Sequence, residues 1–189
     1  NQLTEIVFTD PTYPEKDTPL MENYNISNNQ LKGYDETKQI FAMRSAPLQH
    51  VNISGNQFKV AYFIANTQLV SANMANNQLS SISLSNNQDL VSLICHGNEL
   101  TKITMPKNKG ENVTQIIADD NLLTTLDISA AEGLTDISVA NNRLTAILMP
   151  DADHIETINV SGNNLGLGVL PSSNKYVRSV IFEPQGRLD

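Results

Sequence analysis

The sequence predicts a β-rich solenoid in which short coils stack along one axis, and two observations lead to that prediction. Apolar residues and one asparagine recur at the same internal spacings through most of the 189 residues. Successive copies are displaced by 21 positions, as between Asn77 and Asn98. Self-similarity at a fixed period of roughly 20–50 residues is the signature of a repeat architecture.

Each copy contains two apolar residues separated by one polar residue. This period-two spacing places both apolar side chains on one face of a short strand. An asparagine follows where the chain must turn, and its amide can both donate to and accept from backbone groups that the turn leaves unpaired. A buried polar group without a partner costs about 1–3 kcal/mol. We therefore predict an inward-pointing, structural asparagine ladder made of Asn29, Asn56, Asn77, Asn98, Asn121, Asn142 and Asn163.

A second, weaker apolar pair follows each asparagine, as Ile82 and Leu84 follow Asn77. Each coil should therefore carry a strand on both flanks, with little room for helix. One coil cannot bury its own apolar edge, whereas stacked coils can. Asn66, Asn87 and Asn108 follow the pairs of three successive coils, and alanines 131 and 152 replace them later. We expect this second ladder to stop there and the later turns to be built differently.

The uninterrupted repeat favours a single solenoid domain over residues 1–189, with about eight coils. Residues 9–19, which hold three prolines, and residues 32–46 are predicted to be inserted loops. A last strand around Val180 precedes a polar C-terminal cap at about 171–189. Asn1 and Leu3 match the end of a repeat, so we expect the natural protein to continue upstream.

The frame L-x-x-L-x-L-x-x-N-x-L resembles leucine-rich repeats. The run LSSISLSNNQDLVSLICHGNEL, residues 79–100, is similar to the short 21-residue repeats of Bacteroidetes surface proteins and to the slightly longer repeats of internalins. The resemblance implies a right-handed coil, α/β by leucine-rich-repeat convention, with a concave parallel β-sheet and short second strands on the convex side. It also implies an extracellular or cell-surface protein that contacts other proteins, with a lipoprotein anchor as one option. Ala72 and Ala118 depart from the pattern at leucine positions.

Composition excludes some functions. The net charge is −8 and the 12 basic residues are scattered, which argues against nucleic-acid binding because that relies on clustered Lys and Arg. No apolar run long enough to insert into a membrane is visible, and we expect a monomer without a cofactor. Cys95 is the single cysteine and occupies a core position equivalent to Met74. We interpret it as a small buried hydrophobe.

The candidate binding surface is the outward face of the predicted concave sheet. This face is small and polar, and it lacks the Trp, Tyr and Arg side chains that usually anchor interfaces. Ile94 and Ile117 should lie on adjacent strands about 4.8 Å apart, with His96 beside Asp119. This group is either a small apolar binding spot with a His–Asp pair at its edge, or ordinary β-propensity on a sheet surface. As a catalytic pair, His96 and Asp119 lack a nucleophile beyond exposed serines.

Two other features are candidates. Four acids could form a cation site, but they come from different flanks and match no calcium motif, so a solvated acidic surface is favoured: Asp119, Asp120, Asp127 and Asp136. The two inserted segments could carry recognition, since loops on a rigid scaffold often do, or could cover the open N-terminal end. They hold Tyr13, Tyr34, Phe41 and Arg44.

Three functions compete. The leading prediction is a non-enzymatic leucine-rich-repeat module of a bacterial surface or secreted protein, mediating adhesion-type protein–protein interaction. The second is a structural spacer within a larger adhesin. The third is a β-helix polysaccharide lyase, which needs an acidic cluster with an Arg or Lys base on one exposed sheet. The arginines fall in unrelated positions of the repeat and do not favour the lyase: Arg44, Arg143, Arg178 and Arg187.

Overall fold

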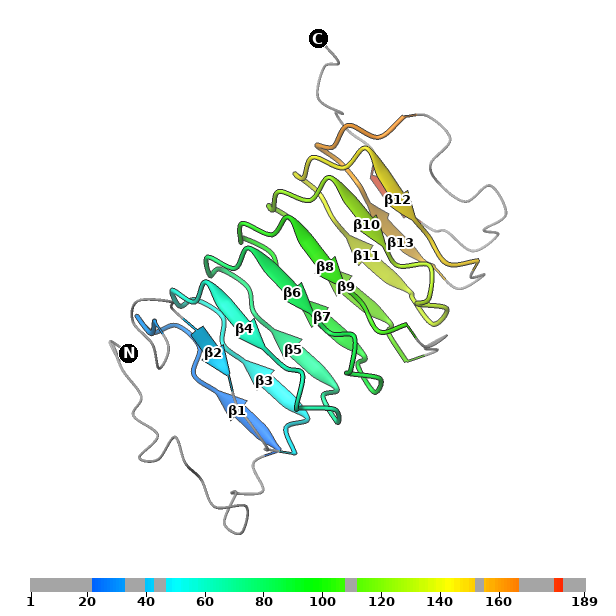
Figure 1. The fold of residues 1–189 in the computed structure, drawn as a ribbon. Helices are drawn as coiled ribbons and strands as arrows, with labels where there is room; N and C mark the ends of the chain where they lie inside the picture. The colour runs from blue at the N-terminus through cyan, green and yellow to red at the C-terminus, as the bar shows by residue number, and fades with distance from the viewer. Residues whose placement is uncertain are drawn as a thin grey trace, which may run out of the picture.

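The computed structural model describes residues 22–32, 40–42, 47–107, 112–151, 155–166 and 179–181. Within these ranges the chain forms 14 strands of three residues each and no helix. Figure 1 shows the coils stacked along one axis as a flattened ribbon with strands on both broad faces. The predicted solenoid is therefore confirmed. The insertion at 9–19 lies outside the described residues, as do most of 32–46 and of the cap at 171–189.

The main sheet takes one strand from each coil, and neighbouring strands are parallel and hydrogen-bonded. Three-residue strands follow from the repeat, since one apolar residue points inward between two that point outward. In order along the sheet the strands are β1 (Asn23–Asn25), β3 (His50–Asn52), β5 (Ser71–Asn73), β7 (Ser92–Ile94), β9 (Gln115–Ile117), β11 (Asp136–Ser138), β13 (Thr157–Asn159) and β14 (Ser179–Ile181).

The opposite flank, which faces the viewer in Figure 1, carries the second strands. They pair only two by two, as β2–β4, β6–β8 and β10–β12. Residues 32–46 were predicted to be irregular, but Ile40–Ala42 forms β2 and pairs with β4 in register, Phe41 opposite Ala61. Inserted residues on both sides of Ile40–Ala42 hide this strand from a search at the regular spacing. The second-flank strands are β2 (Ile40–Ala42), β4 (Val60–Tyr62), β6 (Ser81–Ser83), β8 (Lys102–Thr104), β10 (Thr125–Asp127) and β12 (Ala146–Leu148).

The core is a thin apolar layer between the two flanks, continuous from Leu31 to Leu165. Leu90, Leu93 and Leu100 are fully buried within one coil. Removing apolar surface from water stabilises the stack by about 25 cal/mol per Å². A single coil could not bury this much, so stability depends on neighbours.

The predicted asparagines connect successive coils. Asn98 Nδ2 donates to the carbonyl of Cys95 in its own coil and to that of Met74 in the preceding coil, both at 3.0 Å. Its Oδ1 accepts the backbone N–H of Leu79 in the preceding coil, also at 3.0 Å. The same three kinds of bond recur at five more buried amides, namely Asn56, Asn77, Asn121, Asn142 and Asn163.

Asn29 differs, because it is only half-buried. Its Nδ2 donates to the carbonyls of Ile26 and Ser27 in its own coil. The prediction that all seven amides form one buried column is thus wrong at this position. Asn29 belongs to the first described coil of the stack.

The turn before each ladder asparagine requires a left-handed backbone. Asn76 has φ of 53° and Gly97 has φ of 65°. Only Gly and, at lower cost than other residues, Asn and Asp adopt this conformation. Where a glycine stands, the asparagine of the preceding coil lies over it, as Asn28 Oδ1 would lie 2.6 Å from a Cβ added at Gly55. The residues concerned are Asn28, Gly55, Asn76, Gly97, Asp120, Asn141 and Gly162.

The second ladder is present at Asn66 and Asn87, both buried. Asn87 Nδ2 donates to the carbonyls of Phe63 and Asn66 at 3.1 and 2.6 Å, whereas Asn108 lies outside the described residues. The turn at Ala131 keeps the backbone bond of the earlier turns without their ladder amide, and Ala152 lies outside the described residues. Ala131 N–H donates to the carbonyl three residues before it at 2.9 Å, as Asn66 and Asn87 do at 3.0 Å. The backbone alone therefore specifies this turn.

Candidate functional site

The outward face of the main sheet contains a row of side chains that repeats once per coil. All eight positions pair in register with the equivalent position on the adjacent strand, and each holds Asn, Ser or Ile. We call this the asparagine row, and its members are Asn25, Asn52, Asn73, Ile94, Ile117, Ser138, Asn159 and Ile181.

The asparagines of this row end their strands. Asn52 Oδ1 accepts the N–H of Ser54 at 3.1 Å and its hydroxyl at 2.7 Å. Asn73 Oδ1 accepts the N–H of Ala75 at 3.1 Å. A short side chain that accepts from the backbone two residues ahead forms an Asx turn, which offers the chain an alternative to continuing the strand. The row therefore has a structural reason to be asparagine.

Ile94 and Ile117 interrupt the row at adjacent positions. They are direct partners of β7 and β9, and both are half-buried. An isoleucine cannot accept the hydrogen bond that asparagine accepts in four of the other coils. Two neighbouring residues thus break a local rule and place an apolar pair on a polar face. Departures of this kind occur at functional positions in many proteins, so this pair is the candidate binding spot.

Asp119 was predicted to lie beside His96 at the edge of this spot, but its carboxylate is hydrogen-bonded to other residues. Its Oδ1 accepts the hydroxyl of Ser138 at 2.6 Å and the N–H of Ala140 at 2.7 Å. Ser138 stands where other coils have asparagine, so Asp119 of the preceding coil supplies the missing acceptor. Between these two described residues, His96 and Asp119, there is no hydrogen bond or ion pair. His96 and Asp119 are therefore not hydrogen-bonded to each other. Asp119 instead stabilises the turn of the next coil.

Cys95 lies directly under this face and is fully buried. Burial raises the pKa of its thiol, and the negative charge of Asp119 raises that pKa further. The thiolate is the reactive form of cysteine. A thiol that stays protonated in the core is unreactive and contributes to packing, in agreement with the interpretation of Cys95 as a small hydrophobe.

Two contacts on this face were missed by sequence reasoning. His50 Nδ1 and Ser71 Oγ lie 2.8 Å apart on adjacent strands. Ser92 Oγ donates to Gln115 Oε1 at 3.0 Å two strands further along. The sequence does show that equivalent positions of adjacent coils hold side chains able to hydrogen-bond to each other. Which of these pairs form a bond depends on the side-chain rotamers. These bonds tie neighbouring coils together across the face.

The four acids considered for a cation site do not converge. Asp120 accepts from Asn141 Nδ2 at 2.9 Å, and Asp136 accepts from the hydroxyl of Thr135 at 2.8 Å. Asp127 lies on the other flank, where hydrogen bonds from Ser129 lower its pKa. Among the described residues no group of three or more His, Cys, Asp or Glu side chains could hold a metal ion. The same part of the chain contains no helix long and apolar enough to cross a membrane.

Parallel strands on one face, short second strands on the other and an inward asparagine at each turn define the class of fold: this is a leucine-rich-repeat solenoid. Among solved structures, the chain is similar to the functional domain of InlJ from Listeria monocytogenes, which is described as including a cysteine ladder. The TM-score is 0.59 at 19% identity, over 84% of this chain and 38% of that one. No protein-family model and no curated protein matches the sequence.

The likeness to the InlJ domain establishes the fold, and this chain spans only 38% of the length of that solved chain. The two differ in their ladders. This chain holds one cysteine, Cys95, and the residues that join its coils are asparagines. An amide can bond four ways at once, to carbonyls through its nitrogen and to an N–H through its oxygen.

Proposed function

We propose that this chain is a non-enzymatic recognition module of a bacterial cell-surface or secreted protein, and that it binds a protein partner through the main sheet. The observation that carries the proposal is the pair of adjacent isoleucines, Ile94 and Ile117, in the middle of a row whose other members are polar except for Ile181 at the end of the sheet. The solenoid fold supports it, because stacked coils present a long, rigid surface for binding.

The lyase alternative finds no support on this face. Its chemistry needs a basic residue beside clustered acids, and the described outward positions of the main sheet hold Asp119 and Asp136 but neither Lys nor Arg. Both carboxylates are already hydrogen-bonded to neighbouring side chains. The spacer alternative predicts no binding at all, and the experiment below separates it from recognition.

The test uses a double variant, Ile94→Asn with Ile117→Asn. Four of the other six coils carry asparagine at these positions, so the fold should keep or gain stability while the apolar pair is lost. The matched control is Leu148→Asn, an aliphatic residue that is 58% exposed on the opposite flank. Each fluorescently labelled protein is measured by flow cytometry on cultured epithelial cells, with and without trypsin treatment of the cell surface.

We expect trypsin-sensitive binding by the wild type and the control, and a loss of at least about tenfold in apparent affinity for the double variant, as hot-spot residues typically show. Thermal melting of all three proteins checks the fold. Undiminished binding by the double variant would show that the main sheet is not the site. Failure of the wild type to bind would favour the spacer.

A further inference from the structure

The second flank contains two breaks, and a depression lies at each. Its strands pair as β2–β4, β6–β8 and β10–β12, so β4 and β6 are not hydrogen-bonded to each other, nor are β8 and β10. The cavity at the first break has a volume of about 560 Å³, and the cavity at the second about 440 Å³. Ligand sites typically measure about 300–1,000 Å³, so both are large enough for a small molecule.

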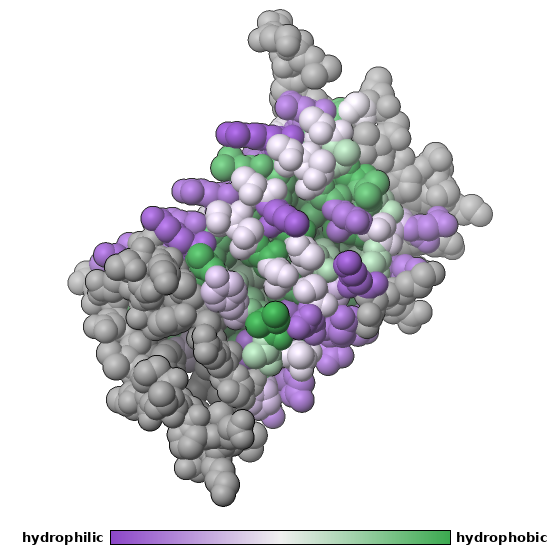
Figure 2. Space-filling model, in the orientation of Figure 1, coloured by the Kyte–Doolittle hydropathy of each residue, from purple (hydrophilic) through white to green (hydrophobic). Residues whose placement is uncertain are grey.

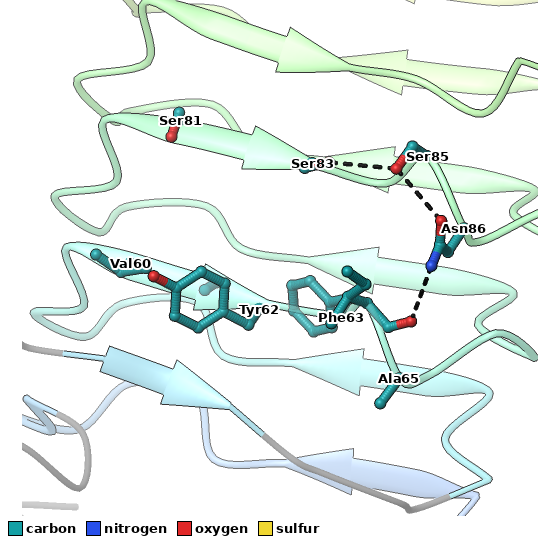
Figure 3. Close-up of a pocket in the computed structure, with 10 residues that line it drawn as sticks. Val60, Tyr62, Phe63, Ala65, Ser81, Ser83, Ser85 and Asn86 are labelled. Atoms are coloured by element: carbon teal, nitrogen blue, oxygen red, sulfur yellow. Dashed lines mark hydrogen bonds between the residues drawn. The ribbon is translucent and has the colours of Figure 1, made fainter.

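The first depression is lined by large side chains on its β4 side and by small side chains on its β6 side. Tyr62 and Ile64 on the β4 side are 53% and 68% exposed. The β6 side is a row of serines, Ser81, Ser83 and Ser85. Figure 3 shows the phenol ring of Tyr62 on β4 and the serines along β6, on opposite sides of the gap. In Figure 2 the exposed apolar residues of this flank stand as separate green areas among paler and purple residues.

The serine hydroxyls of this depression make only long hydrogen bonds within the protein. The Ser83 and Ser85 hydroxyls lie 3.5 Å apart, and Ser85 Oγ lies 3.5 Å from Asn86 Oδ1. These distances are at the long limit for hydroxyl hydrogen bonds, which are strongest near about 2.7–2.8 Å. Such hydroxyls can turn to a ligand at little cost. Asn86 Nδ2 donates to the carbonyl of Ile64 at 3.3 Å, which fixes the amide at the end of the depression.

The residues that line the first depression carry no charge, although the protein as a whole has a net charge of −8. The second depression is different, because Lys102, Lys107 and Asp127 line it. A site without charged residues cannot offset the free-energy cost of removing an ionic ligand from water. The ligand of the first depression should therefore be neutral, with one apolar face and several hydroxyl groups.

We propose that the depression between β4 and β6 binds a neutral saccharide unit. A pyranose ring has a face of C–H groups that can pack on the Tyr62 ring, and hydroxyls at its rim that can exchange hydrogen bonds with Ser81, Ser83 and Ser85. Aromatic surface supplies most of the contact while a few placed polar groups set orientation. This site lies on the flank opposite the Ile94–Ile117 pair, so its test is independent of the proposed function.

The test is a titration of the ¹⁵N-labelled chain, followed by NMR, with millimolar cellobiose, lactose or N,N′-diacetylchitobiose. We expect at least one disaccharide to shift amide signals of residues 60–65 and 81–86. Tyr62→Ala should weaken that binding by roughly threefold to tenfold, the worth of one aromatic contact, while Tyr62→Phe retains it. The matched control is Leu148→Ala, an exposed residue of the same flank two strand pairs away.

Three results would overturn the proposal. One is that none of the three disaccharides shifts these signals. Another is that the shifts persist unchanged in Tyr62→Ala. The third is a dimer in sedimentation velocity that Tyr62→Ala converts to monomer, since the depression would then be a contact between copies of this chain. Tyr62 is more than half exposed, so its removal should leave the fold intact, and circular dichroism of each variant verifies this.

Discussion

Asn98 Oδ1 accepts the backbone N–H of Leu79 from the preceding coil at 3.0 Å. The bond runs backward along the chain, so each turn is completed by the coil that follows it. Equivalent bonds join Phe58 to Asn77 at 3.0 Å and Leu144 to Asn163 at 2.9 Å. Stability therefore resides at the contact between coils, as expected for a quasi-one-dimensional stack.

The first prediction concerns this ladder. Asn98→Ala leaves the buried N–H of Leu79 without an acceptor, and an orphaned buried group costs about 1–3 kcal/mol. We expect urea unfolding to show a loss of that size in the free energy of unfolding. The control is Asn164→Ala, an exposed asparagine beside the ladder position of its own coil, which should change stability by less than about 0.5 kcal/mol. Equal effects of the two variants would contradict a special role for the ladder.

The second prediction concerns the left-handed turn. Gly97→Ala forces an L-residue to φ of 65° and brings its Cβ against Asn76 Oδ1 of the preceding coil. The conformation alone costs about 1–2 kcal/mol, so the thermal midpoint should fall clearly. Gly166→Ala is the comparison, because a Cβ there meets nothing within 4 Å and should be tolerated. A Gly97→Ala variant as stable as Gly166→Ala would show that the turn can relax.

The third prediction concerns the acceptor that Asp119 supplies to the next coil. Asp119→Ala removes the acceptor of both the Ser138 hydroxyl and the Ala140 N–H, and should cost about 1–3 kcal/mol. Adding Ser138→Asn should restore much of the loss, because an asparagine there can accept the Ala140 N–H as Asn73 accepts that of Ala75. Chemical denaturation of the single and double variants measures the rescue. No recovery in the double variant would refute the exchange of roles.

The fourth prediction concerns pH. Burial raises the pKa of the Cys95 thiol above its unfolded value of about 8.5. The folded state therefore keeps this proton when the unfolded state has released it, and stability should fall by up to about 1.4 kcal/mol per pH unit once the pH exceeds about 8.5. Below that pH the thiol is protonated in both states and contributes no slope.

The matching variant is Cys95→Val, since Val139 and Val160 fill the equivalent buried position in later coils. Between about pH 7.5 and 9.5 its stability should decline less than that of the wild type. Ionisation of Tyr24 contributes little to the change in stability over this pH range. Its pKa in the folded state is raised to about 12, and an unfolded tyrosine titrates near about 10. Parallel pH profiles for the two proteins would mean that another group dominates.

Much of the fold could be predicted because the repeat is local. The spacing of Leu90, Leu93 and Asn98 predicted a strand and an inward-pointing asparagine at the turn. The structure has both, with Asn98 hydrogen-bonded to Leu79 of the preceding coil. The strand at Ile40–Ala42 was missed because its neighbours do not follow the period. At Ala131 the same backbone bond as in the earlier second-flank turns forms without a ladder amide, and side-chain identity does not reveal that bond.

The candidate site was less accessible to sequence reasoning. The adjacency of Ile94 and Ile117 follows from the repeat length, and the two residues are register partners. The His96–Asp119 pair was inferred from the same adjacency and did not form, because Ser138 and Ala140 of the next coil offer Asp119 better donors. Which neighbour a flexible side chain chooses depends on groups about 20 residues away in the chain.

By itself the sequence determined the coil length, the inward residues and the ladder, because each follows from spacings within one coil and from its copy in the next. Only the tertiary structure decided which strands of the second flank pair, where its two breaks fall and which partner Asp119 takes. These depend on how the coils settle against one another, since hydrogen bonds between coils compete and the packed stack selects among them.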